Sequence, residues 1–273
     1  MLLLPIDLVL VRHGESDGNS AKHLSESGDH SAFHKLKGRH TSSLRLTSRG
    51  RFQAFITGRY INKHLGPFDR YYTSEYIRAK ETAACMMLKN AVWFCDFCIS
   101  ERDWGGIDVM PEDERDARYG EILKMREVEP FFWKPPNGES LAQLCHRIDG
   151  MLITLARECG DMRVLMVCHD AVMWAFRMRL ERMALETFNR LHLSRDFDDK
   201  IINCQILHYS RRNPTTGHLK PHYTHLNIIR PMYDIDWKLR PRVANKWRPI
   251  VRPQYSNQDL RDMVLKHEPL ANK

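Results

Sequence analysis

The chain has 273 residues, of which 42% are hydrophobic and 28% charged, proportions that fit a soluble globular protein and exclude global disorder. Its seven cysteines are too sparse for a disulfide scaffold, and no apolar run approaches the about 20 residues that a membrane-spanning helix needs. We therefore expect a cytoplasmic protein. The net charge of +8 is carried mainly by the C-terminal part, which bears on association rather than on the fold.

The first chemically distinctive stretch begins with Leu8–Val11, a short continuous apolar run. Such runs are typical of strands in a parallel sheet that is covered on both faces. The run stops at Arg12 and His13. Because ligands of open α/β sheets bind beyond the carboxyl ends of the strands, a cation and an imidazole at this position predict an anion site.

A polar segment at 20–43 follows, which we interpret as a long, partly helical excursion over the active face. Thr47 is a typical N-cap for the amphipathic helix that comes next. Arg70–Thr73 is predicted to be the second strand, and a helix predicted over 75–89 carries Arg78 in its first turn. The second strand therefore also leads to a cation.

A third strand is predicted over 93–99, and Glu101 follows its end. The next segment, about 105–137, is acidic at its start and aromatic at its end, and we interpret it as an inserted lid. Ser140 then begins a helix that extends to about Cys159, with apolar residues at helical spacing. The third strand thus adds a carboxylate to the candidate site.

The fourth strand is predicted over 164–167 and ends at His169 and Asp170, before a helix over 171–183. Two later apolar segments, 201–209 and 222–229, flank a loop rich in turn residues. This arrangement predicts an antiparallel hairpin.

The C-terminal region alternates proline and tryptophan with arginine and lysine, and it has no helical period before about residue 258. We divide the chain into a domain at 1–230 and a basic Pro/Trp-rich extension at 231–273. We expect the extension to pack over the domain, because its prolines and its lack of an apolar stripe suit a covering segment.

Four strand ends lead to candidate ligands for an anion, namely Arg12 with His13, Arg78, Glu101 and His169. The predicted fold class is α/β, a three-layer sandwich with a mostly parallel central sheet and helices on both faces. The lid, the C-terminal hairpin and the basic tail are additions to it. Because parallel strands end at one edge of a sheet, residues distant in the sequence are expected to converge there.

With this full set of residues, the chain resembles the histidine phosphatase superfamily, also called phosphoglycerate mutase-like, from Leu8 to about Tyr209. The matching motifs occur in the family's order: Val11–Asn19, parts of Lys37–Ala54, Thr73–Ala83, Glu101–Gly105, Asn137–Ser140 and Val167–His169. The Glu-Arg-Asp-Trp-Gly motif at 101–105 is similar to the phosphatase-type branch.

The resemblance implies that His13 is the nucleophile and becomes phosphohistidine. A neutral imidazole nitrogen is a competent nucleophile near neutral pH, which agrees with this role. Glu101 would be the general acid for the leaving alkoxide and then the base for the attacking water. We expect no cofactor and no metal.

The resemblance also implies a phosphate-binding set around the nucleophile. Arg12 and Arg78 would hold the phosphoryl oxygens, because guanidinium groups match them bidentately. His169 would add a third donor, and Asn19 would supply a neutral hydrogen bond.

Asp170 departs from the pattern of this branch, which usually has glycine after the second histidine. A His-Asp pair is similar to the acid phosphatase and phytase branch, in which the Asp is the proton donor. Asp170 therefore either shares or takes over the acid role of Glu101, or it caps the following helix. We favour the cap, because Asp is a common N-cap residue.

The motifs favour a phosphomonoester hydrolase that acts on a small phosphorylated metabolite. One alternative is a phosphoglycerate mutase-type phosphotransferase, although mutases of the family carry Glu-Arg-His-Tyr-Gly at the position of Glu101–Gly105. Another is a phosphate-binding regulatory module that docks through its basic tail. We expect neither a membrane nor nucleic acid as a partner, and the sequence leaves the oligomeric state open.

Overall fold

The computed structural model describes residues 3–231 and 246–266. A seven-stranded sheet organises this part of the chain, in the order β3-β2-β4-β1-β5-β6-β7. The strands are β1 (Asp7–Arg12), β2 (Arg70–Ser74), β3 (Trp93–Asp96), β4 (Arg163–Cys168), β5 (Ile206–Ser210), β6 (His225–Ile229) and β7 (Arg248–Pro249).

The first four strands in chain order form the parallel part of the sheet. β4 lies between β1 and β2 and is parallel to both, and β2 is parallel to β3. β5, β6 and β7 continue the sheet from β1 in antiparallel order. The mostly parallel sheet and the C-terminal antiparallel pair are therefore confirmed, and the carboxyl ends of four strands meet at one edge.

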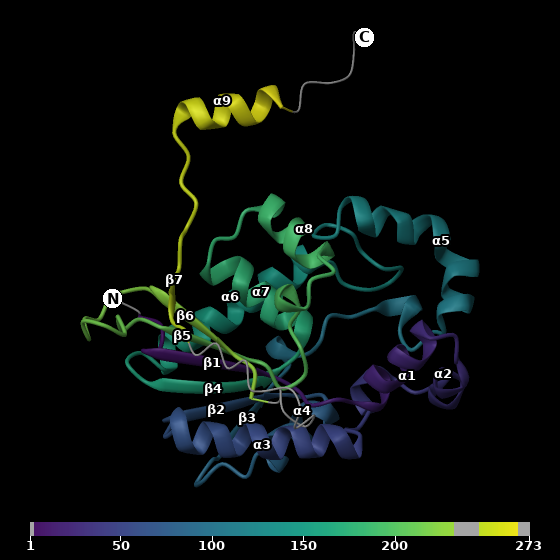
Figure 1. Cartoon of the computed structure of the whole chain (residues 1–273), viewed down its shortest axis with the longest axis horizontal. Coiled ribbons are helices and arrows are strands. Elements are labelled where there is room, and N and C mark those ends of the chain that lie inside the picture. The colour runs from purple at the N-terminus through teal and green to yellow at the C-terminus, as the bar shows by residue number, and fades with distance from the viewer. Residues whose placement is uncertain (1–2, 232–245, 267–273) are drawn as a thin grey trace.

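Helices cover both faces of the sheet, which confirms the three-layer prediction (Figure 1). Alternate residues of β1 face the two sides, so that Leu8 and Leu10 belong to one core cluster and Val9 and Val11 to the other. The helices are α1 (Asp17–Glu26), α2 (Ser31–Leu36), α3 (Ser48–His64), α4 (Ile77–Cys85), α5 (Glu112–Val128), α6 (Leu141–Glu158), α7 (Asp170–Leu180), α8 (Leu185–Leu193) and α9 (Asn257–Leu265). In Figure 1, α3 and α4 lie below the sheet and α6 and α7 above it.

Two predicted helix starts are confirmed by their caps. The Thr47 side chain accepts a hydrogen bond from the Gly50 amide at the start of α3. Ser140 and Gln143 form a reciprocal capping box at the start of α6. Both helices therefore begin where local hydrogen bonding alone favours it.

The third strand is shorter than predicted. β3 ends at Asp96, whose side chain accepts a hydrogen bond from the Cys98 amide and so starts a 3-10 turn over Phe97–Ile99. The helix predicted over 75–89 is also shorter, since α4 begins at Ile77 and ends at Cys85. In both cases the interior of the element was predicted correctly and its ends were not.

The helix predicted over 171–183 ends earlier, and a second helix follows that the sequence did not indicate. α7 stops at Leu180, and Arg182 adopts the left-handed region with φ of 49°. α8 begins three residues later. A left-handed residue cannot continue a right-handed helix, which explains the break.

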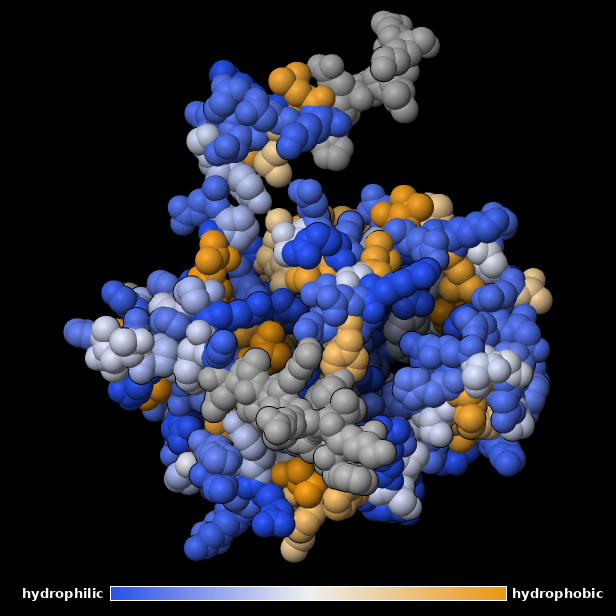
Figure 2. Space-filling model, viewed as in Figure 1, coloured by the Kyte–Doolittle hydropathy of each residue, from blue (hydrophilic) through white to orange (hydrophobic). Residues whose placement is uncertain are grey.

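The C-terminal extension packs over the domain only in part. β7 adds to the edge of the sheet, and Arg252 donates hydrogen bonds to the carbonyl oxygens of Leu180 and Tyr223. α9 buries no residue and stands away from the body in Figures 1 and 2. The packing prediction is therefore wrong for α9. The boundary at 230 and 231 stays a prediction, because 232–245 lie outside the described residues.

The visible surface is mostly hydrophilic, with apolar side chains in scattered spots (Figure 2). Among the described residues, no helix combines the length and apolar character that crossing a membrane requires. The α9 arm carries both acidic and basic side chains, Asp259, Arg261, Asp262 and Lys266.

Candidate active site

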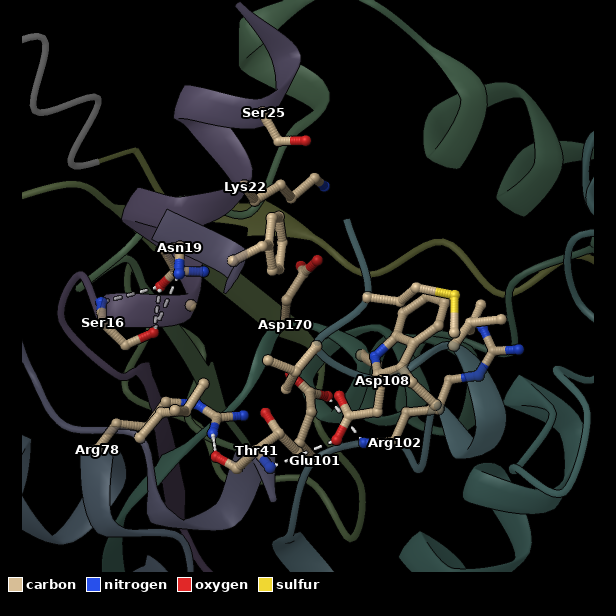
Figure 3. A pocket seen from close by; sticks show the side chains of 18 of the residues that line it. Ser16, Asn19, Lys22, Ser25, Thr41, Arg78, Glu101, Arg102, Asp108 and Asp170 are labelled. Carbon is tan, nitrogen blue, oxygen red and sulfur yellow. Dashed lines mark hydrogen bonds between the residues drawn. The ribbon is translucent and has the colours of Figure 1, made fainter. Parts of the chain in front are cut away.

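A cavity of about 450 Å³ lies at the carboxyl edge of the parallel strands. The predicted site residues that line it are Arg12, His13, Asn19, Arg78, Glu101 and Asp170. They come from the end of β1, from α1, α4 and α7, and from the segment after β3. Figure 3 shows Arg78 on one side of Glu101 and Arg102 on the other, with Lys22 of α1 across the cavity. The fold therefore brings these residues together. His169, the remaining predicted residue, lies beside His13 but is fully buried and is not part of the cavity lining.

His13 is buried and held in one orientation. Its Nδ1 lies 2.7 Å from the carbonyl oxygen of Gly14, so this nitrogen carries the proton and donates it. Its Nε2 accepts a hydrogen bond of 3.2 Å from Arg78 Nε. Burial, followed by the charges of Arg78 and Arg12, holds the pKa of His13 well below its usual range. The imidazole is therefore neutral, and its Nε2 lone pair, which accepts from Arg78 here, can attack an electrophile once the Arg78 Nε–H donates to a bound anion instead.

This depressed pKa predicts a nucleophile that works at acidic pH. A group whose pKa is lowered keeps its neutral form as the pH falls, so we expect phosphoenzyme formation to persist from about pH 7 to about pH 5. The measurement is the single-turnover rate with an aryl phosphate, corrected for the second ionisation of the phosphate group. A corrected rate that fell tenfold per pH unit below the ordinary histidine pKa of 6.5 would contradict this expectation.

Both arginines present unpaired charge to the cavity. Arg78 donates from Nη1 to the carbonyl oxygen of Thr41 at 2.7 Å, and Arg12 donates from Nη1 to that of Ile201 at 2.6 Å. Neither forms an ion pair with a carboxylate in the described part of the chain. Their guanidinium groups are therefore free to compensate an anion such as phosphate.

Asn19 is oriented by donors that converge on one of its atoms. Its Oδ1 accepts hydrogen bonds from the Ser16 amide, the Ser16 hydroxyl and Asn203 Nδ2, each at 3.1 Å. The amide nitrogen of Asn19 is consequently the group left for a ligand. Asn203 Nδ2 also donates to the carbonyl oxygen of His13 at 3.0 Å, and it thereby links Asn19 to the end of β1.

Glu101 and His169 lie together beside the nucleophile, with His169 fully buried and Glu101 mostly buried. Glu101 Oε2 lies 3.8 Å from His169 Nδ1, and Glu101 Oε1 accepts a hydrogen bond of 2.9 Å from the Arg102 amide. Burial raises the pKa of Glu101, with a further contribution from Asp170, while Arg78 opposes the shift. A carboxyl with a raised pKa can hold a proton for a leaving group, as a general acid requires.

His169 is fully buried, and its ring centroid lies 5.1 Å from that of His13. Its Nε2 lies 2.7 Å from the Ser74 hydroxyl at the end of β2. Burial, followed by the charge of Arg78, lowers its pKa well below the ordinary value. The second histidine is thus neutral and is held by a side chain from the neighbouring strand.

The helix-cap interpretation of Asp170 is wrong. His169 occupies the N-cap of α7, and Asp170 is the first helical residue, without a side-chain cap hydrogen bond. Its Oδ1 is buried without a partner in the described residues, and Figure 3 shows the carboxyl directed into the cavity that Glu101 and Lys22 also line. The negative charge near the helix N-terminus is still favourable, but the side chain faces the site.

His13, Glu101 and His169 also offer ligand atoms that lie within 4.8 Å of one another, a spacing that could hold a metal ion. A cation there would share the cavity with Arg12 and Arg78, which carry no compensating carboxylate in the described residues. Electrostatics therefore favour an anion over a metal at this position.

The sequence indicated neither Ser74 nor Asn203 as a site residue, and it left Arg126 unnoticed within the lid. Arg126 of α5 lines the cavity, with its guanidinium 5.2 Å from the ring centroid of Trp104 and 5.8 Å from that of Trp133. Ser74 stands next to a motif that the sequence did indicate, whereas no local pattern marks Asn203.

Comparison with known proteins decides the family. Residues 8–197 match the model of the histidine phosphatase superfamily, branch 1. The chain belongs to this superfamily. Membership supports a phosphatase or phosphotransferase role, since phosphatases and mutases are both among the proteins that it resembles.

This chain, as a member of the superfamily, shares moderate sequence identity with curated relatives. It is 29% identical over 169 residues to a 6-phosphofructo-2-kinase/fructose-2,6-bisphosphatase of Gallus gallus, covering 62% of this chain and 31% of that protein. It is 29% identical over 180 residues to a 2,3-bisphosphoglycerate-dependent phosphoglycerate mutase of Methylobacterium radiotolerans. This match covers 64% of this chain and 78% of the mutase. The match thus spans about a third of the bifunctional enzyme.

Solved structures share the fold at lower identity. A structure titled mycobacterial hydrolase 1 aligns with a TM-score of 0.60 and 19% identity, covering 92% of this chain and 99% of that one. A mycobacterial glucosyl-3-phosphoglycerate phosphatase in complex with VO3 aligns with a TM-score of 0.59 and 20% identity. This alignment covers 75% of this chain and 92% of the phosphatase chain. These likenesses confirm the α/β architecture of the superfamily for this chain.

Proposed function

We propose that this histidine phosphatase hydrolyses a phosphomonoester of a small metabolite through a phosphohistidine at His13. The observation that carries the proposal is the neutral Nε2 of His13, which lies in a cavity beside two arginines without carboxylate partners among the described residues. A neutral nucleophile next to positive charge that no carboxylate compensates suits in-line attack on a phosphoryl group, because the phosphoryl oxygens can take over the Arg78 N–H that Nε2 now accepts.

In the first step, His13 Nε2 forms a bond to phosphorus while the bond from phosphorus to the ester oxygen breaks. Arg12, Arg78 and the amide nitrogen of Asn19 stabilise the charge on the equatorial oxygens. Glu101 transfers its proton to the leaving oxygen, so that the product departs as an alcohol and Glu101 becomes a carboxylate.

In the second step, the Glu101 carboxylate removes a proton from water, and the hydroxide formed attacks the phosphorus of phosphohistidine. The bond between phosphorus and Nε2 breaks, and inorganic phosphate and neutral His13 are regenerated. The same carboxyl thus acts first as acid and then as base, which its burial between Arg78 and Asp170 supports.

The test is release of inorganic phosphate from a panel of phosphosugars, nucleotides and phosphoamino acids by the full chain. Release in proportion to enzyme supports hydrolysis. Transfer of label to a second phosphorylated acceptor without release would favour the mutase alternative. Neither release nor transfer across the panel would overturn the proposal and favour the regulatory binding module.

The cavity also supports a second anionic group on the substrate. Its volume lies in the range that holds ligands much larger than phosphate. Arg126 forms no hydrogen bond or ion pair with another described residue, and its partly buried side chain packs against Trp104 and the lid residue Trp133. His192 of α8 and Lys22 of α1 line the same cavity, and burial together with Arg126 lowers the pKa of His192 to about 4. His192 is therefore neutral at neutral pH and Lys22 pairs with Glu26, so the charge that an oxyanion would compensate here is that of Arg126.

The names of the relatives agree with a substrate of this class. Fructose 2,6-bisphosphate, 2,3-bisphosphoglycerate and glucosyl-3-phosphoglycerate, which those names contain, each carry a second phosphate or a carboxylate. We propose a small phosphorylated metabolite with a second oxyanion as the substrate class, without choosing among these compounds.

We expect Arg126→Ala to weaken binding of substrates with a second anion selectively. The matched pair is 3-phosphoglycerate and glycerol 3-phosphate, which differ in a carboxylate. A charged hydrogen bond contributes about 1.5–3 kcal/mol, so KM for 3-phosphoglycerate should rise about tenfold or more, and that for glycerol 3-phosphate should change little. Exposed Arg118 of the same helix provides the control, as Arg118→Ala. An equal effect on both substrates would contradict the second-anion subsite.

A further inference from the structure

Tyr76 occupies the space between two of the candidate phosphate ligands, although neither the motifs nor the proposed mechanism gives it a role. It is the N-cap of α4, two residues after the end of β2. The Arg78 guanidinium carbon lies 4.8 Å from the centroid of its ring, and the His169 ring meets it edge-on with centroids 5.1 Å apart. The aromatic ring therefore contacts both groups at once.

We propose that Tyr76 is a positioning residue, whose ring holds the Arg78 guanidinium against the nucleophile and away from the buried carboxyl of Glu101. This inference rests on the proposed function and deepens it, because it assigns the group that keeps the cation and the general acid apart. The ring acts through Arg78 and does not itself need to touch the substrate.

The contacts of Arg78 support this assignment. The side chain is 4% exposed, yet all of its partners are neutral: His13 Nε2, the Thr41 carbonyl oxygen and the face of Tyr76. Within the described residues it makes no ion pair, although Glu101 is close enough to influence the charge of both groups. Arg78 and Glu101 thus lie close together without pairing, and the contact with the Tyr76 ring is one of the three that fix Arg78 in this arrangement.

The face of an aromatic ring can hold a guanidinium in such an arrangement. It attracts a guanidinium through the ring quadrupole and fixes its plane without neutralising its charge. The geometry thus leaves the charge of Arg78 for the phosphoryl group. It also leaves Glu101 without an ion pair to Arg78, so that the carboxyl can hold a proton.

Loss of the ring should therefore affect both phosphate binding and proton transfer. In Tyr76→Leu, Arg78 is free to turn to Glu101, and an ion pair lowers a carboxyl pKa. The other groups that face Glu101 are Arg12 from β1, His169 after β4, Asp170 from α7 and the Arg102 amide, and the substitution leaves all of them in place.

The experiment measures wild type, Tyr76→Leu, Tyr76→Met and Tyr76→Phe in the full chain. For Tyr76→Leu and Tyr76→Met we expect the dissociation constant of inorganic phosphate, from calorimetry, and KM for a phosphomonoester to rise roughly tenfold. Deprotonated Glu101 cannot protonate the leaving group, so kcat falls at high pH. In the two variants without the ring, this fall in kcat should begin about one pH unit lower than in wild type. Tyr76→Phe should match wild type, because its hydroxyl makes no hydrogen bond to a described residue.

Tyr60→Leu on α3 is the control for loss of a half-buried tyrosine ring, and it should change neither readout. Two variants without an aromatic ring are used because one of them could fail to fold. Thermal melting shows whether each variant is folded. Wild-type phosphate affinity and an unmoved pH limb in Tyr76→Leu or Tyr76→Met would overturn the proposal, as would equal losses in Tyr76→Phe. If wild type binds phosphate but hydrolyses no ester, the hydrolase proposal fails, while the phosphate titration still tests Tyr76.

Discussion

Replacing His13 with alanine is expected to abolish phosphate release, with kcat reduced by a factor on the order of 10⁴ or more, as for loss of other covalent nucleophiles. The reason is local: His13 lines the cavity as a neutral imidazole, and its contacts with the Gly14 carbonyl oxygen and Arg78 fix its orientation. No other neutral nucleophile among the described residues combines this burial with contact to the arginine.

The decisive measurement is the capture of the phosphorylated enzyme rather than the rate of phosphate release. Wild type is incubated with a ³²P-labelled phosphomonoester and quenched, and the protein-bound label is tested for the acid lability of phosphohistidine. We expect label on wild type and on His23→Ala, which removes an exposed histidine of α1, and none on His13→Ala. Label of equal amount on His13→Ala would place the covalent step elsewhere.

Replacing Glu101 with glutamine is the second substitution with a large expected effect. We expect kcat to fall by roughly 10²- to 10⁴-fold with an alkyl phosphate, the usual contribution of a positioned general acid. The loss in the rate of phosphoenzyme formation, measured in a single turnover, should be much smaller with para-nitrophenyl phosphate, whose leaving group needs no proton. Breakdown of the phosphoenzyme needs Glu101 as a base with either substrate and should be slowed equally. The raised pKa of the buried Glu101 carboxyl, next to Asp170, is the physical basis of this difference.

Asp170→Asn distinguishes the two carboxyls. Because Asp170 faces the cavity and has an unpartnered Oδ1 among the described atoms, the structure keeps it as a candidate proton donor. We expect a smaller loss than for Glu101→Gln, about tenfold or less, since Glu101 is the carboxyl next to His169. If the leaving-group dependence follows Asp170→Asn instead, Asp170 is the acid and Glu101 supports it.

The outline of the fold could be predicted because its signals are local. Four apolar residues of β1 indicated a strand buried on both faces, and the structure places alternate side chains in two separate core clusters. Thr47 and Ser140 marked helix starts through hydrogen bonds within three residues. Hydrophobic periodicity and helix caps depend on residues that are close in the sequence, so no tertiary contact is needed to recognise them.

The errors occurred where neither period nor composition marks the outcome. Asp170 has the composition of a cap, but His169 takes that position, and the carboxyl of Asp170 turns into the cavity. The break between α7 and α8 depends on one left-handed residue, Arg182. α9 was expected to lie on the domain and buries nothing.

The sequence by itself determined the α/β class, the order of the four parallel strands, and the motif residues of the candidate site, because motif and period are properties of neighbouring positions. Only the tertiary structure decided the charge environment: a neutral His13, arginines without carboxylate partners in the described chain, and a buried Glu101 beside Asp170. It alone placed Arg126 and Tyr76 at the site. Desolvation and charge pairing depend on which distant side chains share a cavity, and spacing along the chain does not encode that.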